Sequence, residues 1–325
     1  MDTAFTRALG IEVPLLCGAM YPCSNPELVA AVSEAGGIGI VQPLSLTYVH
    51  GHEFREGLRT IRRLTGKPIG VNFIIEQSSR RYLERTRRWV DIALEEEVPL
   101  FVTALGNPRW VVDLARPAGA TVYHDVTNRH WAEKALDGGV DGLICVNNRA
   151  GGHAGSESPE VLFDTLAPLG KPLVCAGGIG EAAAFARMIR LGYAGVQLGT
   201  RFIASDECSA HSDYKRAILQ ARESDIVLTE RITGVPVSII RTPYIDRVGT
   251  HAGRIAKWLL GGPRTKHWVR ALYSLQSIWR LKHTVSQGMG YRSCYQAGKS
   301  VESITGIEPV ATIVAEYAAA LRDPP

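Results

Sequence analysis

The sequence predicts an α/β protein built as a closed (β/α)8 barrel, a TIM barrel, with a smaller helical insertion. Two observations predict this fold. Short apolar runs alternate with helical patterns over the first two-thirds of the chain, and eight such runs occur without a break in the rhythm. Alternating strands and helices form a parallel sheet with right-handed crossovers, and eight units close it into a barrel. A doubly wound open sheet is the alternative fold, because strand counting from one sequence is imprecise.

Each element of the expected barrel has its own stretch of sequence. The apolar runs predict strands at 13–20, 37–41, 69–75, 100–105, 120–126, 141–146, 171–178 and 194–200. Apolar residues at helical spacing, with helix-type caps, predict helices at 26–35, 50–65, 80–97, 107–117, 128–138, 158–168 and 180–191.

The rhythm stops after Arg201, and the chain then divides into three parts. Residues 1–209 make the barrel. Residues 210–294 show no strand signal and are rich in Trp, Tyr, Arg and Lys, which predicts a helical domain that covers the substrate. Residues 295–325 return to the barrel surface through an amphipathic helix. Four aromatic residues of the insertion either line the substrate cavity or, as we favour, form its core: Trp258, Trp268, Tyr273 and Trp279.

Composition excludes several classes of protein. The 325 residues are 46% hydrophobic and 21% charged, with a formal net charge of +4, so a large core can form. The basic stretches at 80–88 and 254–282 lack the interleaved aromatic pattern of a nucleic-acid platform and are interpreted as solvated helix faces. The six cysteines show no CxxC pair or metal spacing, and no apolar stretch could span a bilayer. We expect a cytoplasmic protein that binds no metal, nucleic acid or membrane. The oligomeric state is left open, with a homodimer as one option.

The active site of such a barrel forms at the carboxyl ends of the strands. The predicted ends are polar or glycine-rich, whereas the strand interiors are apolar. These ends carry Gly18-Ala19-Met20, Gln42, Asn72, Thr103, His124-Asp125, Asn147 through His153, Ala176-Gly177-Gly178 and Gly199-Thr200.

Two of these ends predict a phosphate site. "AGGIG" and "LGTRF" each place backbone N–H groups, free of large side chains, just before a helix. The other interpretation is that these glycines only make tight turns. Asn72 offers a carboxamide to a ring edge, and Met20 offers a soft contact to a flat face. A phosphate and a planar ring describe FMN, whereas pyridoxal phosphate would need a strand-end lysine, which is absent here.

His153 is the candidate catalytic residue, because it lies among Gly151, Gly152 and Gly155 at a strand end. Flanking glycines remove the packing partners that would justify a buried structural imidazole, and they let the backbone approach a ligand. His124 also lies near a strand end, but a buried, hydrogen-bonded core role is equally well supported for it.

The ordered set "GAM", "GGIGIV", "GVNF", "AGGHAG", "CAGGIG", "GVQLGTRF" and "YQAGKS" resembles the nitronate monooxygenase family through nearly the whole chain, most weakly over 205–290. The resemblance implies FMN and aligns His153 with the family's catalytic histidine, which in some members also removes the α-proton of a neutral nitroalkane. It places FMN contacts at Gly18, Ala19, Met20, Asn72, His124, Gly151, Gly152, Ala176, Gly177, Gly178, Gly199 and Thr200. The implied reaction oxidises an alkyl nitronate with O2 to a carbonyl compound and nitrite.

The same motifs are similar to those of two sister groups, the flavin-dependent enoyl-acyl carrier protein reductases and the NADH:quinone reductases, which would use NAD(P)H. This chain departs from its relatives at three places. Arg149 replaces an acidic residue of the reductases and offers a cation to an anionic substrate. Asp125 stands where some relatives have lysine, and Thr305-Gly306 where some have serine. A flavin-free barrel lyase or isomerase and a non-catalytic partner protein are the remaining alternatives.

Overall fold

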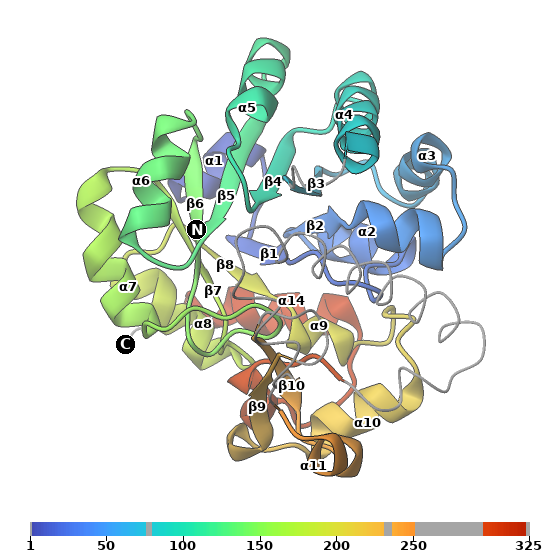
Figure 1. Cartoon of the computed structure of the whole chain (residues 1–325), viewed down its shortest axis with the longest axis vertical. Helices are drawn as coiled ribbons and strands as arrows, with labels where there is room; N and C mark the ends of the chain where they lie inside the picture. The colour runs from blue at the N-terminus through green and yellow to red at the C-terminus, as the bar shows by residue number, and fades with distance from the viewer. Residues whose placement is uncertain (1, 76–79, 231–235, 251–294, 323–325) are drawn as a thin grey trace.

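Eight parallel strands form a closed barrel in the computed structural model, which describes residues 2–75, 80–230, 236–250 and 295–322 (Figure 1). Each strand pairs with the next along the chain, and β1 pairs with β8 through Leu16 and Gln197 to close the barrel. The closed barrel is therefore confirmed, and the open-sheet alternative is wrong. The barrel strands are β1 (Leu15–Cys17), β2 (Ile38–Val41), β3 (Ile69–Ile74), β4 (Leu100–Ala104), β5 (Thr121–Val126), β6 (Gly142–Val146), β7 (Leu173–Ala176) and β8 (Gly195–Leu198).

The predicted helices between the strands are all present and surround the barrel (Figure 1). They are α2 (Pro26–Glu34), α3 (Phe54–Leu64), α4 (Arg80–Glu95), α5 (Arg109–Ala115), α6 (Arg129–Asp137), α7 (Pro159–Leu166) and α8 (Ala182–Leu191). Local signals set their starts: Asn128 and Ser158 accept backbone hydrogen bonds at the N-termini of α6 and α7. None of the described helices is long and apolar enough to cross a membrane.

Shorter elements complete the described chain. They are α1 (Ala4–Leu9), α9 (Thr200–Ile203), α10 (Ser212–Gln220), α11 (Pro243–Val248) and α14 (Val310–Ala320), the π-helical turn η1 (Ser45–Val49), and the 3-10 turns η2 (Arg116–Ala118), η3 (Ala167–Leu169), η4 (Glu223–Asp225) and η6 (Lys299–Ser303).

The interior of the barrel is filled with apolar side chains and is closed at its amino end. Alternate strand residues point inward, and they cluster with residues of α1 and the segment after it. The Phe5 ring of α1 meets the ring of Tyr123 edge-on, with 5.5 Å between the ring centroids. The amino end is therefore plugged, which leaves the carboxyl end as the mouth of the barrel. The inward cluster contains Phe5, Leu9, Ile11, Leu16, Ile38, Ile40, Leu100, Val102, Tyr123, Ile144, Val174 and Ala176.

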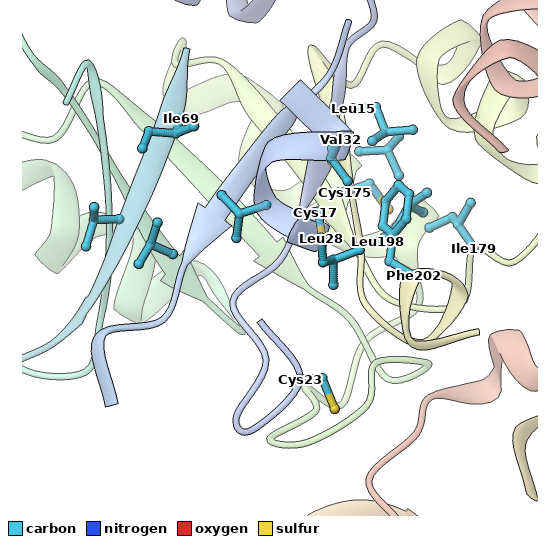
Figure 2. Packing of buried hydrophobic residues seen from close by; sticks show 14 of the residues in the cluster. Leu15, Cys17, Cys23, Leu28, Val32, Ile69, Cys175, Ile179, Leu198 and Phe202 are labelled. Atoms are coloured by element: carbon cyan, nitrogen blue, oxygen red, sulfur yellow. The ribbon is translucent and has the colours of Figure 1, made fainter. Parts of the chain in front are cut away.

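The other strand residues pack against the helices. Figure 2 shows part of this outer core, where Leu15 and Cys17 of β1 lie beside Leu28 and Val32 of α2 and Leu198 of β8. The cysteines at 145 and 175 belong to it as small apolar residues, as expected, and the five described cysteines are all buried and form no disulfide with one another.

The insertion differs from the prediction of a purely helical segment. Alongside α10 and α11 it contains an antiparallel pair of strands, β9 (Ile226–Thr229) and β10 (Val237–Ile240), which lie together with the two helices on one side of the molecule (Figure 1). Each strand is only four residues long, so its pattern gives little signal beside the longer helical patterns that follow. The predicted aromatic residues between 258 and 279 lie outside the described residues.

The described part of the C-terminal segment packs on the helices of the barrel. Helix α14 packs on α8 and α2, and the rings of Phe185 and Tyr317 lie 5.2 Å apart. The buried Arg201, at the end of "LGTR", donates to the carbonyl oxygen of Gly306 at 3.0 Å and to the carboxylate of Glu308 at 2.8 Å. This buried guanidinium therefore anchors the returning chain beside β8.

Tyr317 provides a test of this packing. Its ring is buried, but its hydroxyl oxygen has no hydrogen-bond partner. Removing an unsatisfied buried hydroxyl costs nothing, so Tyr317→Phe should raise the free energy of unfolding by about 1 kcal/mol. Tyr317→Ala should lower it by about 3–5 kcal/mol, because a ring-sized cavity remains. Urea unfolding of both variants measures the contrast, and a destabilised Tyr317→Phe would contradict the buried, unpaired hydroxyl.

Candidate functional site

Parallel closure brings the predicted strand ends together around one mouth. Asn72 of β3 lies on the inner face, since its neighbours Val71 and Phe73 belong to the outer core. Its side-chain amide donates to the carbonyl oxygen of Val102 on β4 at 3.3 Å. The carboxamide is thus held in place at the lip of the barrel, where the sequence predicted a contact for a planar ring.

Asn147, directly after β6, organises the loop that carries His153. Its side-chain oxygen accepts from the backbone N–H of Arg149 at 2.8 Å, and its amide donates to the carbonyl oxygen of Gly177 at 3.0 Å. Its own carbonyl oxygen accepts from the N–H of Gly155 at 3.2 Å. This fully buried side chain joins the loop after β6 to the turn after β7. Sequence reasoning included Asn147 only as the start of the loop.

Gly151 has no room for a side chain, because the backbone of Gly298 lies against it. A Cβ on Gly151 would lie 2.8 Å from the backbone nitrogen of Gly298, and a Cβ on Gly298 would lie 2.7 Å from the backbone nitrogen of Gly151. Contacts this close exclude any side chain at either position. The two backbones therefore pack directly on each other, which gives Gly151 a reason independent of a ligand. Its predicted FMN contact stays a prediction.

The next two glycines of "AGGHAG" have separate reasons. Gly152, at φ +68°, makes a small antiparallel bridge with Ser238 of β10, donating at 3.4 Å and accepting at 2.7 Å. A Cβ on Gly155 would lie 2.4 Å from the carbonyl oxygen of Val146. The loop is therefore held against the insertion on one side and the barrel on the other.

His153 itself stays accessible between these contacts. Its side chain is exposed and makes no hydrogen bond with a described residue. The surrounding protein still desolvates the imidazole in part, which lowers its pKa from the ordinary value. A neutral imidazole with a free nitrogen at neutral pH suits a general base.

His124 faces away from the predicted cofactor site. On β5 it alternates with the inward Tyr123 and shares a face with Val122 and Val126 of the outer core. The hydroxyl of Thr103 donates to the carbonyl oxygen of Tyr123 at 3.1 Å, so it accepts from Nδ1–H of His124 at 2.8 Å. Burial lowers the pKa of His124 to about 4. The geometry supports the core interpretation of His124 rather than a cofactor contact.

Arg149 is engaged by the protein itself. Its guanidinium makes a bidentate ion pair with Glu223 of η4, at 3.0 and 2.6 Å, and Lys299 contacts the same carboxylate at 3.2 Å. These cations hold the pKa of Glu223 below its usual range. The predicted substrate contact of Arg149 therefore competes with a pair that ties the β6 loop to the insertion and to the C-terminal segment.

The glycine turn after β7 is shaped by the same loop. Gly177 and Gly178 have φ values of +117° and +80°, which side chains rarely adopt. A Cβ on Gly177 would lie 2.6 Å from Oδ1 of Asn147, and one on Gly178 would lie 2.6 Å from Cβ of Arg149. The neighbouring Ala176 belongs to the inner core.

The turn after β8 is more open. A Cβ on Gly199 would meet only the sulfur and side-chain carbon of Met20, at 3.6 Å or more. Gly199 is the N-cap of α9 and has no side chain that could accept a hydrogen bond from it. The first backbone N–H groups of this helix are therefore left for other acceptors. The hydroxyl of Thr200 accepts from the N–H of Gly298 at 3.0 Å. Met20 thus lies beside Gly199 at this turn, and the predicted FMN contacts of Met20, Gly199 and Thr200 stay predictions.

The loop after β1 completes this side of the mouth. A Cβ on Gly18 would lie 3.0 Å from the side chain of Gln197 on β8, and Ala19 packs on the inner core. Both predicted positions therefore lie at the mouth, next to the turn after β8.

Asp125 is the residue that sequence reasoning undervalued. Its alternation with Tyr123 places it on the inner face, one layer nearer the mouth. Its Oδ1 atom is buried with no hydrogen-bond partner, and desolvation raises the pKa of the carboxyl to about 7. The available signal was the two-residue period counted from Tyr123.

Leu105 is a second residue missed at the mouth. It follows β4 with φ +61° and is 64% exposed, although neither left-handed backbone nor exposure suits a leucine. A Cβ on the following Gly106 would lie 2.2 Å from the carbonyl oxygen of Ile75, which leaves the turn little freedom.

Over the described part of the chain, no group of three His, Cys, Asp or Glu side chains could hold a metal ion.

A closed barrel of eight parallel strands places the protein in the (β/α)8-barrel class. A family model described as nitronate monooxygenase matches residues 2–319, and the chain therefore belongs to the nitronate monooxygenase family of oxidoreductases.

The relatives that this chain is similar to carry different names. A CoA-thioester dehydrogenase of Mycobacterium tuberculosis, (3aS,4S,5R,7aS)-5-hydroxy-7a-methyl-1-oxo-octahydro-1H-indene-4-carboxyl-CoA dehydrogenase, is 28% identical over 76% of this chain and 68% of its own length. A probable nitronate monooxygenase of Staphylococcus saprophyticus is 27% identical over 78% of this chain and 83% of its own.

Solved structures agree on the fold. FabK from Thermotoga maritima superimposes with a TM-score of 0.79 and 29% identity, covering 99% of this chain and 96% of its own. The nitroalkane oxidase of Streptomyces ansochromogenes gives a TM-score of 0.78 at 23% identity, over 98% of both chains. At that identity, the second likeness supports the fold alone.

Gly151→Ala tests the close backbone contact. The added methyl group must push the backbone at 297–298 away, which should lower the free energy of unfolding by about 1–3 kcal/mol and displace the loop of His153. Gly66→Ala is the matched control, because its Cβ would meet nothing within 4 Å. Denaturant unfolding compares the two variants, and equal stabilities would contradict direct backbone packing at Gly151.

His124 and Asp125 predict opposite pH dependences of stability. Folding lowers the pKa of His124 to about 4, so its contribution is present above about pH 6.5 and is lost as the pH falls toward 4. Folding raises the pKa of Asp125 to about 7, so its contribution is present at acid pH and is lost as the pH rises from about 3.9 through 7.

The two slopes oppose each other in the wild type between about pH 4 and 6.5. Asp125→Asn should therefore give a stability that rises more steeply with pH in this window, whereas His124→Gln should give one that falls. Urea unfolding at half-unit pH steps measures both slopes. Identical profiles for the wild type and both variants would mean that neither group titrates in this way.

Proposed function

We propose that the protein is an FMN-dependent oxidoreductase that oxidises alkyl nitronates with O2 to carbonyl compounds and nitrite. The observation that carries the proposal is the accessible, neutral imidazole of His153 at the carboxyl end of the barrel, in a loop anchored by Asn147. Membership of the nitronate monooxygenase family supports the same reaction class.

The residues present at the mouth fit FMN. Asn72 and Asp125 offer polar groups on the inner face for the edge of a planar ring. The buried Oδ1 of Asp125 has no hydrogen-bond partner, so it can accept a hydrogen bond from a ligand or carry a proton. The open Gly199 and the uncapped start of α9 offer backbone N–H groups to a phosphate. Bound FMN would accept electrons from the nitronate and pass them to oxygen.

His153 has two tasks on this proposal. For a neutral nitroalkane, its free imidazole nitrogen takes the α-proton, for which its lowered pKa keeps it unprotonated at neutral pH. For a nitronate, which has already lost that proton, His153 only orients the substrate. Arg149 is predicted to attract an anionic substrate. This contact requires the substrate to share the guanidinium of Arg149 with Glu223.

The second candidate is an NAD(P)H-dependent reductase acting on a quinone or an enoyl thioester, or a dehydrogenase of a CoA thioester. The name of the Mycobacterium tuberculosis relative favours the thioester form of this candidate. In addition, Glu223 compensates the positive charge of Arg149, which weakens the specific argument for a small anionic substrate.

His153→Asn separates the two tasks of the histidine. Loss of a general base should lower kcat/KM for a neutral nitroalkane by about 10²–10⁴-fold, whereas turnover of propionate 3-nitronate should fall much less. His130→Asn, an exposed histidine on α6, is the matched control and should leave both activities unchanged. Equal losses on the two substrates would assign His153 a role other than proton abstraction.

Anaerobic mixing distinguishes the two candidate functions. On the nitronate proposal, NADH and NADPH leave the flavin absorbance unchanged, whereas propionate 3-nitronate bleaches it. Rapid bleaching by either pyridine nucleotide, followed by reoxidation with a quinone or an enoyl thioester, would overturn the proposal in favour of the reductase. A purified protein with no absorbance near about 450 nm, and no capacity to take up FMN, would overturn both.

A further inference from the structure

Asp125 is the one carboxylate in the eight strands of the barrel, all of which the structure describes in full. Its position on the inner face sets it above the ring of Tyr123, toward the mouth. No lysine or arginine occurs in any barrel strand to pair with it. A buried carboxylate with an unpartnered oxygen and no cation costs free energy unless it is protonated or meets a ligand.

Among the described residues, the groups around Asp125 leave it without a charged partner. On β4 no residue titrates. On β5 its neighbours are Tyr123 and the neutral His124, and on β6 the titratable residue is Cys145. Burial raises the pKa of both the Tyr123 hydroxyl and the Cys145 thiol, so both stay neutral. From the loop after β6, the free imidazole of His153 is neutral as well, and Arg149 is paired with Glu223.

Asn72 gives Asp125 a companion on the same inner face. The two residues lie on β3 and β5, separated by the single strand β4, whose inward residues in its half nearer the mouth are Val102 and the small Ala104. A flat ligand lying over β4 therefore meets a carboxamide on one side and a carboxyl on the other. Both groups can bond in the plane of a ring, which suits the polar edge of a heteroaromatic ring.

We propose that Asp125 is a direct contact of the bound flavin ring and that, as a neutral acid, it donates a hydrogen bond to an acceptor on the polar edge of that ring. This inference rests on the proposed function, because it takes FMN as the ligand. Binding then requires that the carboxyl keeps its proton. Ionised, the same group would bring a negative charge against the lone pairs of the ring acceptors.

The direction in which the Kd for FMN changes with pH follows from the linkage between proton binding and ligand binding. The carboxyl of the free protein has a pKa of about 7, and a ligand that binds the neutral form raises it further. The Kd for FMN should therefore rise by about tenfold per pH unit above pH 7, until the pH reaches the pKa of the complex. Asp125→Asn keeps a donor and carries no charge, so its Kd should change by less than about twofold between pH 7 and 9.

The experiment measures the Kd for FMN by quenching of flavin fluorescence at pH 7, 8 and 9. Asp141→Asn is the matched control, because Asp141 lies at the opposite end of the barrel, where its carboxylate accepts from the N–H of Val122 at 2.8 Å. It should retain the wild-type slope. The infrared carbonyl band of a protonated carboxyl should also persist at pH 8 in the wild-type FMN complex and be absent from Asp125→Asn.

Two failures are distinguishable. A wild-type Kd that does not change over this range, or an Asp125→Asn variant with the wild-type slope, overturns the role of Asp125 and leaves the proposed function standing. Failure of the wild-type protein to bind FMN at any of these pH values overturns both. Because the infrared band is read on the wild type first, a misfolded variant does not decide the outcome.

Discussion

Closure of the barrel through β1 and β8 is the constraint on which the rest of this structure depends. Once Leu16 pairs with Ile38 on one side and Gln197 on the other, every strand has two neighbours, and all eight carboxyl ends face one mouth. The plug formed by α1 then fills the other end with apolar side chains. Any polar residue at the last inward position of a strand consequently faces the mouth, whatever its distance in the sequence.

The same closure explains which parts of the site the sequence could predict. The strand ends were predictable because apolar runs end in glycine or polar residues, and the structure places those ends within a few residues of the expected positions. The face of each residue was harder to predict. In "ATVYHDV" a shift of one residue exchanges the two faces, and only the packing of Tyr123 on Phe5 shows that Asp125 points inward and His124 outward. The sequence predicted a cofactor contact at His124, because histidine is a common active-site residue, although its neighbour Asp125 has the more exposed position at the mouth.

The glycines of "AGGHAG" show a second limit of reasoning from one sequence. A glycine signals that something comes close, but not what. The neighbours of Gly151 and Gly152 are the backbones of Gly298 and Ser238, from segments about 145 and 85 residues further along the chain. The short strand β10 carried too little periodicity to be predicted, so its partner in the loop could not be predicted either. The geometry nevertheless leaves His153 accessible, because the contacts hold the backbone on both sides of it.

The loop that carries His153 is held by segments outside the barrel as well as by the strand ends. The loop of His153 is fastened to the insertion by Ser238 and by the pair between Arg149 and Glu223, and to the C-terminal segment by Gly298. Ser238 and Glu223 lie in the stretch where the motifs shared with relatives are fewest, whereas Gly298 lies in the shared motif "YQAGKS". Glu223, which comes from the insertion, balances the charge of Arg149 in this loop, so the electrostatics beside His153 depend on a residue far from it in the sequence.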